Sequence, residues 1–184
     1  MANDTPDIGR LARWPRRIAR RKGFGIHSPF AFDFVRRVIA QPCDYYAYET
    51  IAAQARSASD RRLARLLFRV VLFFRPERIA ADTPLSPACL AALKTAMPAA
   101  ATEPSVKAPQ LIIVSPGSAY TTESLTDCIS RGGTVLFNGL HRGNLNQMSA
   151  LWRNTDHGML FRGRSVAVMA GLTHLPHQKF DVWI

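Results

Sequence analysis

Hydrophobic residues between positions 61 and 74 recur with the spacing of an amphipathic helix. The apolar side chains stand three or four residues apart, and the arginines fall outside their stripe, which consists of Leu63, Leu66, Leu67, Val70, Val71 and Phe74. Such a stripe is typical of a helix that covers a core with one face. We therefore expect a helix over 61–74 that lies against a sheet and leads into a first strand over 78–82.

Short apolar runs alternate with helical patterns through the rest of the chain. The runs at 110–115 and 134–138 have the length and composition of buried parallel strands. Helical patterns accompany them at 88–97, 121–130 and 144–153. Two later runs, 159–161 and 165–170, predict an antiparallel hairpin, and 180–184 predicts a terminal strand or extended tail. This order predicts an α/β fold with a Rossmann-like, mostly parallel sheet and a closing hairpin.

Helices are also expected before residue 61. The pair Ser28-Pro29 is typical of a helix start, and the apolar positions that follow predict a helix to about Ala40. A second helix is predicted over 50–58. We therefore divide the chain into a helical N-terminal region, 1–60, and an α/β domain, 61–184.

Length and composition agree with this division. The chain has 184 residues, 47% of them hydrophobic, which suits one domain with an N-terminal extension. Its three cysteines are widely spaced, so neither a disulfide framework nor a CxxC metal site is indicated, and we expect a cytoplasmic protein without a bound metal. No apolar run approaches the roughly 18 to 20 residues that a membrane-spanning helix needs.

Positive charge is concentrated near the N-terminus. The net charge is +11, and residues 1–37 hold nine Lys or Arg against three acids. Apolar residues from Ile8 to Ile18 recur at helical spacing, interrupted by Pro15. This segment is either a solvated basic arm or a contact for RNA or an anionic membrane surface. The basic residues in question are Arg10, Arg13, Arg16, Arg17, Arg20, Arg21 and Lys22.

The connection between the helix at 88–97 and the strand at 110–115 is short and rich in Pro and Ala. A single parallel crossover takes roughly 10 to 12 residues, so two strands and their helix do not fit there. We therefore expect a sheet that lacks two strands, with 79–82 as its edge strand. Because an unpaired strand edge invites pairing, this edge is the expected surface for a homodimer or a protein partner.

One stretch of the N-terminal region is distinctive enough to suggest a family. The run GFGIHSPFAFDFVRRVI, followed by YYAYETI, contains the motif GxHSPF at Gly25, His27, Ser28, Pro29 and Phe30. It resembles the N-terminal region of a group of class I S-adenosylmethionine-dependent methyltransferase-like proteins from Bacteroidetes. In that group, the helical region precedes a Rossmann-like domain.

The resemblance implies a cofactor site that this chain does not reproduce. Such enzymes hold S-adenosylmethionine with a glycine-rich loop after the first strand and with an acid that ends the second strand. The acidic-then-glycine pattern falls here on Ala81, Thr83 and Pro87, none of which suits that role. The ribose-binding acid has no place in the shortened connection.

We therefore expect a shortened, degenerate methyltransferase-like protein with no cofactor, no catalytic residue and a structural or binding role. An active S-adenosylmethionine-dependent methyltransferase with an atypical site is the first alternative. Its cofactor would lie near Asp82, Thr83, Ser115, Asn138 and His141. A basic adaptor that binds RNA or anionic membrane through the N-terminal arginines is the second alternative.

Overall fold

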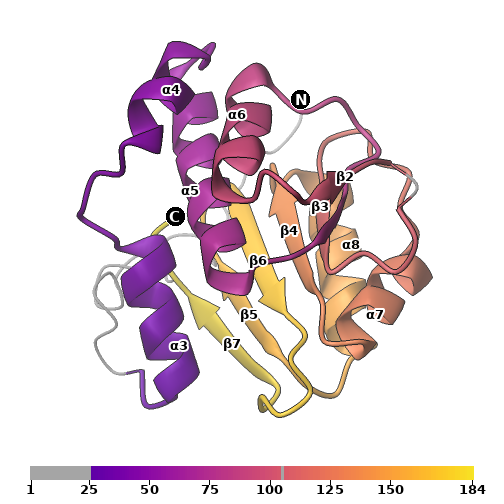
Figure 1. Cartoon of the computed structure of the whole chain (residues 1–184). Helices are drawn as coiled ribbons and strands as arrows, with labels where there is room; N and C mark the ends of the chain where they lie inside the picture. Colours follow the sequence, from indigo (N-terminus) through magenta and orange to yellow (C-terminus); the bar gives the residue numbers. More distant parts are fainter. Residues whose placement is uncertain (1–25, 105) are drawn as a thin grey trace, which may run out of the picture.

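The computed structural model describes residues 26–104 and 106–184, which form three layers (Figure 1). A seven-stranded sheet lies in the middle. One face is covered by α6 (Pro87–Ala96) and by the four helical elements that precede β1, and the other face by α7 (Thr122–Ser130) and α8 (Arg142–Arg153). The predicted α/β class is confirmed, including the mostly parallel sheet, the antiparallel pair near the C-terminus and the N-terminal helices.

The sheet has the order β2-β1-β3-β4-β6-β5-β7. Only β6 runs against its neighbours, since β4 and β5 both pair with it in antiparallel fashion and the remaining pairs are parallel. The strands are β1 (Arg78–Ala80), β2 (Ala101–Thr102), β3 (Leu111–Val114), β4 (Thr134–Asn138), β5 (Met159–Arg162), β6 (Val166–Ala170) and β7 (Gln178–Asp181). Successive residues of β3 alternate between the two hydrophobic clusters, so both faces of the sheet are buried.

Helical segments connect or precede the strands. They are α3 (Pro29–Phe34), the π-helix η2 (Val35–Ile39), α4 (Ala47–Ala53), α5 (Ala58–Phe74), α6 (Pro87–Ala96), α7 (Thr122–Ser130) and α8 (Arg142–Arg153). The apolar stripe of α5 faces the sheet as predicted, with Leu66, Leu67, Val70 and Val71 at most 1% exposed.

The boundaries of α4 and α5 differ most from the sequence-based expectation. The helix predicted over 50–58 is α4, which ends at Ala53, and α5 begins at Ala58 rather than at 61. The reason is an N-cap at Ser57, whose side chain accepts a hydrogen bond from the Asp60 amide, while the Asp60 carboxylate accepts one from the Arg56 amide. This reciprocal capping fixes the start of α5.

The expectation that 79–82 forms the sheet edge is wrong. A two-residue strand, β2, pairs in parallel with β1 on the side away from β3. It fits because the described residues between β2 and β3, 103–104 and 106–110, contain no helix. Eight residues separate the two strands in the chain, and eight extended residues can span about 26 Å, twice the length of a four-residue strand. The edge is therefore the exposed Ala101–Thr102 segment, and a partner at this edge stays a prediction.

The basic segment from Arg10 to Lys22 lies outside the described residues, so its predicted contacts with RNA or membrane also stay predictions. None of the helices in 26–104 and 106–184 combines the length and apolar character needed to cross a membrane.

One histidine, His157, links three connections on the α7 side through hydrogen bonds. His157 Nδ1 lies 2.7 Å from Asp156 Oδ1, and its Nε2 donates to the carbonyl oxygens of Gly171 at 3.1 Å and Ile129 at 3.4 Å. Both ring nitrogens thus carry hydrogen in the charged form. The hydrogen bond to Asp156, opposed by burial and aided by the two carbonyls, raises the pKa of His157 above its ordinary 6.5.

We predict that replacing Leu66 by Asp abolishes soluble folding. Leu66 is 1% exposed beneath the sheet, and burying an unpaired carboxylate costs several kcal/mol, comparable to the stability of a domain. Soluble yield and a thermal melt measure the effect. Leu90→Asp is the matched control, because Leu90 is 40% exposed on α6 and tolerates a charge. Equal yields and melting midpoints for the two variants would contradict the placement of α5.

We also predict that His157 makes stability depend on pH. Because its pKa is raised in the folded state, its contribution is complete below the ordinary pKa and is lost as the pH rises through the folded-state pKa. The melting midpoint should fall from pH 6 to pH 9, and His157→Asn should flatten this slope. The exposed His174 supplies the control, since His174→Asn should keep the wild-type slope. An unchanged slope in His157→Asn would show that the charge of His157 does not stabilise the fold.

Candidate functional site

The chain turns in opposite directions from two neighbouring strands, β1 and β3. From β1 it continues to β2 on one side, and from β3 it continues to β4 on the other. In open α/β sheets, ligands bind in the crevice that such a reversal creates at the carboxyl ends of the strands. The loops 81–86 and 115–121 meet at this point, which makes it the candidate functional site.

A carboxylate from the first loop bridges this crevice. Asp82 follows β1, and its Oδ2 accepts hydrogen bonds from the Ser118 hydroxyl at 3.0 Å and from the Ala119 amide at 2.6 Å. Hydrogen bonds to an ionised acceptor are roughly twice as strong as neutral ones. The corner after β1 is therefore fastened to the loop after β3 by the chain's own groups.

The start of α6 has few free donors to offer a ligand. Pro87 is its first residue and has no amide hydrogen, and the Cys89 amide donates to the Ser86 hydroxyl oxygen at 3.1 Å. The Ser86 hydroxyl itself donates to Asp60 Oδ1 of α5 at 2.6 Å. A helix N-terminus binds anions through exposed amides, and here proline and serine have replaced or engaged two of them.

Tyr120 fixes the loop after β3 through two further hydrogen bonds. The Tyr120 hydroxyl donates to the Pro104 carbonyl at 3.2 Å, and the Gln147 side chain of α8 donates to the Tyr120 carbonyl. Burial, together with the nearby Asp82 carboxylate and Cys128, raises the pKa of Tyr120 to about 12. Tyr120 thus stays a neutral phenol and cannot serve as a base near pH 7.

The structure brings together only some of the predicted site residues. Asn138 at the end of β4 donates to the Ser115 hydroxyl after β3, at 3.4 Å. His141 Nδ1 contacts the Gly139 carbonyl at 2.9 Å. A carbonyl only accepts, so Nδ1 carries hydrogen and Nε2 is the acceptor in the neutral ring. Asp82 bonds the loop that follows Ser115, not Ser115 itself.

Two buried side-chain oxygens at the corner can accept further hydrogen bonds. Asp82 Oδ1 and Thr83 Oγ1 are buried and have no hydrogen-bond partner among the described residues. Unpaired buried acceptors are uncommon and cost free energy. The corner could therefore still accept hydrogen bonds from a polar ligand.

One acid that sequence reasoning missed lies beside this corner. Glu103 directly follows β2, and its amide donates to the Ile79 carbonyl at 3.2 Å. The expectation that no acid ends the second strand is therefore wrong. A two-residue strand leaves no periodic pattern in the sequence, so only the pairing with β1 reveals the position of Glu103.

An open hollow of about 660 Å³ lies between α7 and α8, next to the crevice. Of the five predicted site residues, only His141 lines it. Hydroxyl and amide side chains make up much of the remaining wall, including Ser118, Thr121, Asn144 and Gln147. Asn144 is 6% exposed and donates to the Gly139 carbonyl at 3.0 Å, which fixes the turn after β4.

Metal and thiol chemistry find no support at this site. The described ranges contain no group of three or more His, Cys, Asp or Glu that could hold a metal ion. Cys128 is fully buried on α7, and burial raises its pKa to about 12. Such a thiol remains protonated and is a poor nucleophile.

Comparison of the chain with protein-family models, with curated proteins and with solved structures found no match. A function for this chain therefore has to be inferred from its own residues and geometry.

We predict that Asp82→Ala loosens the crevice. Removing the carboxylate leaves the Ser118 hydroxyl and the exposed Ala119 amide to water, which should lower the free energy of unfolding by about 0.5–1.5 kcal/mol. Hydrogen exchange measured by NMR should show faster exchange of the Ala119 amide. Glu103→Ala removes a nearby exposed acid and serves as the control. Unchanged Ala119 exchange in a folded Asp82→Ala protein would contradict the bridge.

Proposed function

We propose that this protein is a methyltransferase-like α/β protein whose corner no longer binds S-adenosylmethionine and whose role is structural or in binding. The observation that carries the proposal is the pair of hydrogen bonds from Ser118 and Ala119 to Asp82. They occupy the place where an open α/β sheet takes its ligand.

The energetic consequence is a weakened cofactor site. A cofactor entering the crevice displaces these hydrogen bonds and must pair the freed hydroxyl, amide and carboxylate again. Each hydrogen bond to a charged group contributes about 1.5–3 kcal/mol, and each 1.4 kcal/mol changes affinity tenfold. The absence of glycine from 81–87, together with Pro87 at the helix start, removes further backbone contacts. These losses together turn a micromolar site into one too weak to fill in a cell.

An active S-adenosylmethionine-dependent methyltransferase is the second candidate, and Glu103 favours it. The acid that ends the second strand holds the ribose in the family that the N-terminal motif resembles, and Glu103 directly follows β2. The unpaired Asp82 Oδ1 and Thr83 Oγ1 add acceptors at the same edge. His141 Nε2 supplies an acceptor beside the hollow between α7 and α8.

Calorimetric titration with S-adenosylmethionine and with S-adenosylhomocysteine separates the two candidates. We predict no saturable heat up to millimolar ligand, because the crevice is closed by Asp82. A micromolar dissociation constant, or cofactor that purifies with the protein, would overturn the proposal.

The variant Glu103→Gln tests the role of Glu103 directly, because it removes the charge and keeps the shape of the side chain. If the wild-type protein binds the cofactor and the variant binds at least tenfold more weakly, Glu103 is a ribose ligand and the second candidate holds. Glu77→Gln, an exposed acid before β1, is the matched control and should bind like the wild type.

A further inference from the structure

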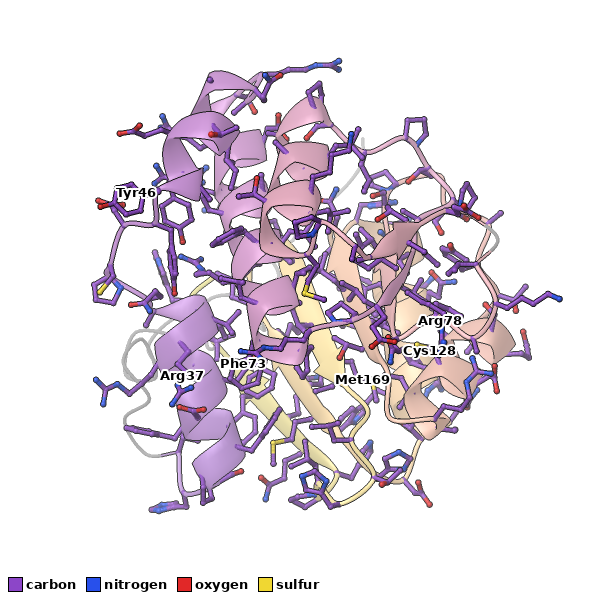
Figure 2. All side chains as sticks on the ribbon, viewed as in Figure 1. Arg37, Tyr46, Phe73, Arg78, Cys128 and Met169 are labelled. Atoms are coloured by element: carbon purple, nitrogen blue, oxygen red, sulfur yellow. The ribbon has the colours of Figure 1, made fainter. Side chains whose placement is uncertain are left out.

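The positive charge of the described chain is concentrated on the helices of one face. Residues 26–75 contain eight arginines against four acids, whereas residues 76–184 contain nine Lys or Arg against seven acids. The excess therefore belongs to α3, η2, α4 and α5, on the side of the sheet opposite to α7 and α8. In Figure 2, Arg37 and Phe73 lie with these helices, well away from Cys128 on α7.

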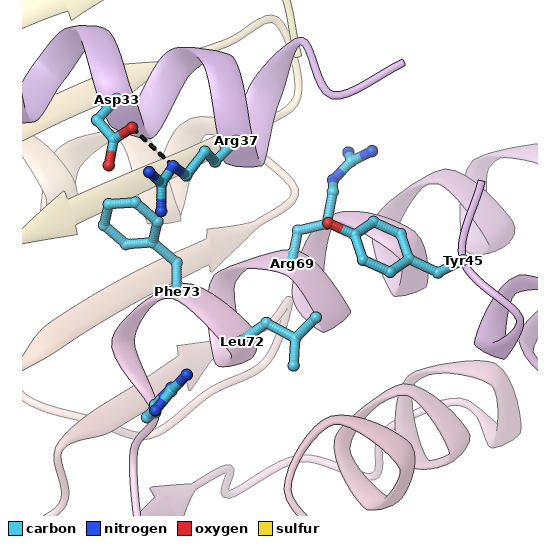
Figure 3. A pocket seen from close by; sticks show the side chains of 7 residues that line it. Asp33, Arg37, Tyr45, Arg69, Leu72 and Phe73 are labelled. Atoms are coloured by element: carbon cyan, nitrogen blue, oxygen red, sulfur yellow. Dashed lines mark ion pairs between the residues drawn. The ribbon is translucent and has the colours of Figure 1, made fainter. Parts of the chain in front are cut away.

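A hollow of about 450 Å³ opens among these helices (Figure 3). Arg37 from η2 lines it together with Arg69 and Arg75 at α5, and Asp33 is its one carboxylate among the described residues. The formal charge of the lining is thus +2. Tyr45 and Phe73 supply aromatic walls. A volume of this size is within the range of small-molecule sites.

The three guanidinium groups are only weakly engaged. Arg37 pairs with Asp33 at 2.7 Å, but the two side chains are 70% and 45% exposed, and exposed pairs one helical turn apart contribute little. Arg69 donates to the neutral Tyr48 hydroxyl at 3.3 Å, and its Nε has no partner among the described residues. Within 26–104 and 106–184, neither Arg69 nor Arg75 forms an ion pair with a carboxylate.

The backbone at Arg75 adopts a conformation that is uncommon for a residue other than glycine. Arg75 ends α5 in the left-handed conformation, with φ of 50° and ψ of 52°, and Pro76 follows it. Glycine is the usual residue at such a helix end, since it adopts these angles without steric cost. Strain at a non-glycine residue is a feature of functional sites, and here it sets an arginine at the rim of a charged hollow.

Local helix geometry adds a second unusual feature at the same place. η2 is a five-residue π-helix, and Arg37 belongs to it. Such segments are rare and are frequent at functional sites. The carbonyl ends of helices attract positive side chains, which accounts for single arginines near the ends of η2 and α5 but not for three around one hollow.

We propose that this hollow binds a small ligand that carries a phosphate monoester on an aromatic body, of the size of a mononucleotide. Arginine recognises phosphate through paired hydrogen bonds, and a dianion matches the +2 charge of the lining. Tyr45 and Phe73 then contact the aromatic body. The hollow borders Arg75, which precedes β1, whereas Asp82 follows β1 at its carboxyl end. The proposed site is therefore separate from the Asp82 corner and does not depend on whether that corner binds a cofactor.

Calorimetric titration with adenosine 5′-monophosphate tests the proposal, with adenosine and inorganic phosphate as comparison ligands. Saturable binding of the monophosphate is expected, together with no binding of adenosine and at least tenfold weaker binding of inorganic phosphate. Absence of monophosphate binding overturns the proposal, and so does equal affinity for inorganic phosphate. A single-stranded RNA that binds at least tenfold more tightly than the monophosphate and competes with it would also overturn it, in favour of a nucleic-acid surface.

Variants locate the site and separate binding from stability. Arg37→Gln and Arg75→Gly should each weaken monophosphate binding at least tenfold, whereas Arg75→Gly should keep or raise the melting midpoint because it relieves the strained backbone. Asp33→Asn should strengthen binding about threefold, since it removes the opposing charge. Arg131→Gln is the matched control, because Arg131 pairs with Asp127 one turn away on α7, as Arg37 does with Asp33. Equal affinity in all four variants would place any binding elsewhere.

Discussion

The contact between the Asp82 carboxylate and the loop 115–121 decides what the carboxyl edge of the sheet can do. Parallel strands that leave in opposite directions open a crevice between β1 and β3, and an open crevice at that position is the usual ligand site of such folds. Ser118 and Ala119 both donate to Asp82 across it. Tyr120 and Gln147 anchor the same loop to neighbouring segments, so the position of the loop does not rest on one side chain.

At the start of α6, on the other side of the corner, hydrogen-bonding groups are likewise engaged within the chain. Serine and proline make a well-capped helix start, and Ser86 also reaches Asp60 on α5. Glycine would have left the amides open for a ligand, whereas Ser86 and Pro87 favour a stable junction between the helical layer and the sheet. The corner thus gains stability through contacts that engage its own hydrogen-bonding groups.

Most of the fold can be predicted from hydrophobic periodicity in the sequence, whereas the candidate site cannot. The apolar stripe of α5 and the continuous runs of β3 and β4 are long enough to fix element type and the buried face. A strand of two exposed residues, Ala101 and Thr102, has no such pattern and forms only because β1 offers an unpaired edge. Glu103 was missed for that reason. The bond from Ser118 to Asp82 joins residues 36 positions apart, and no local signal in the sequence predicts it.

Chemical-shift mapping by NMR during a titration with S-adenosylhomocysteine tests the closed corner most directly, because it reports on each amide around the crevice. If Asp82 keeps the crevice closed, the amides of Thr83, Glu103 and Ala119 should not move up to millimolar ligand. Saturating shifts at these three amides, with a micromolar midpoint, would contradict closure and show that the corner opens to admit a cofactor.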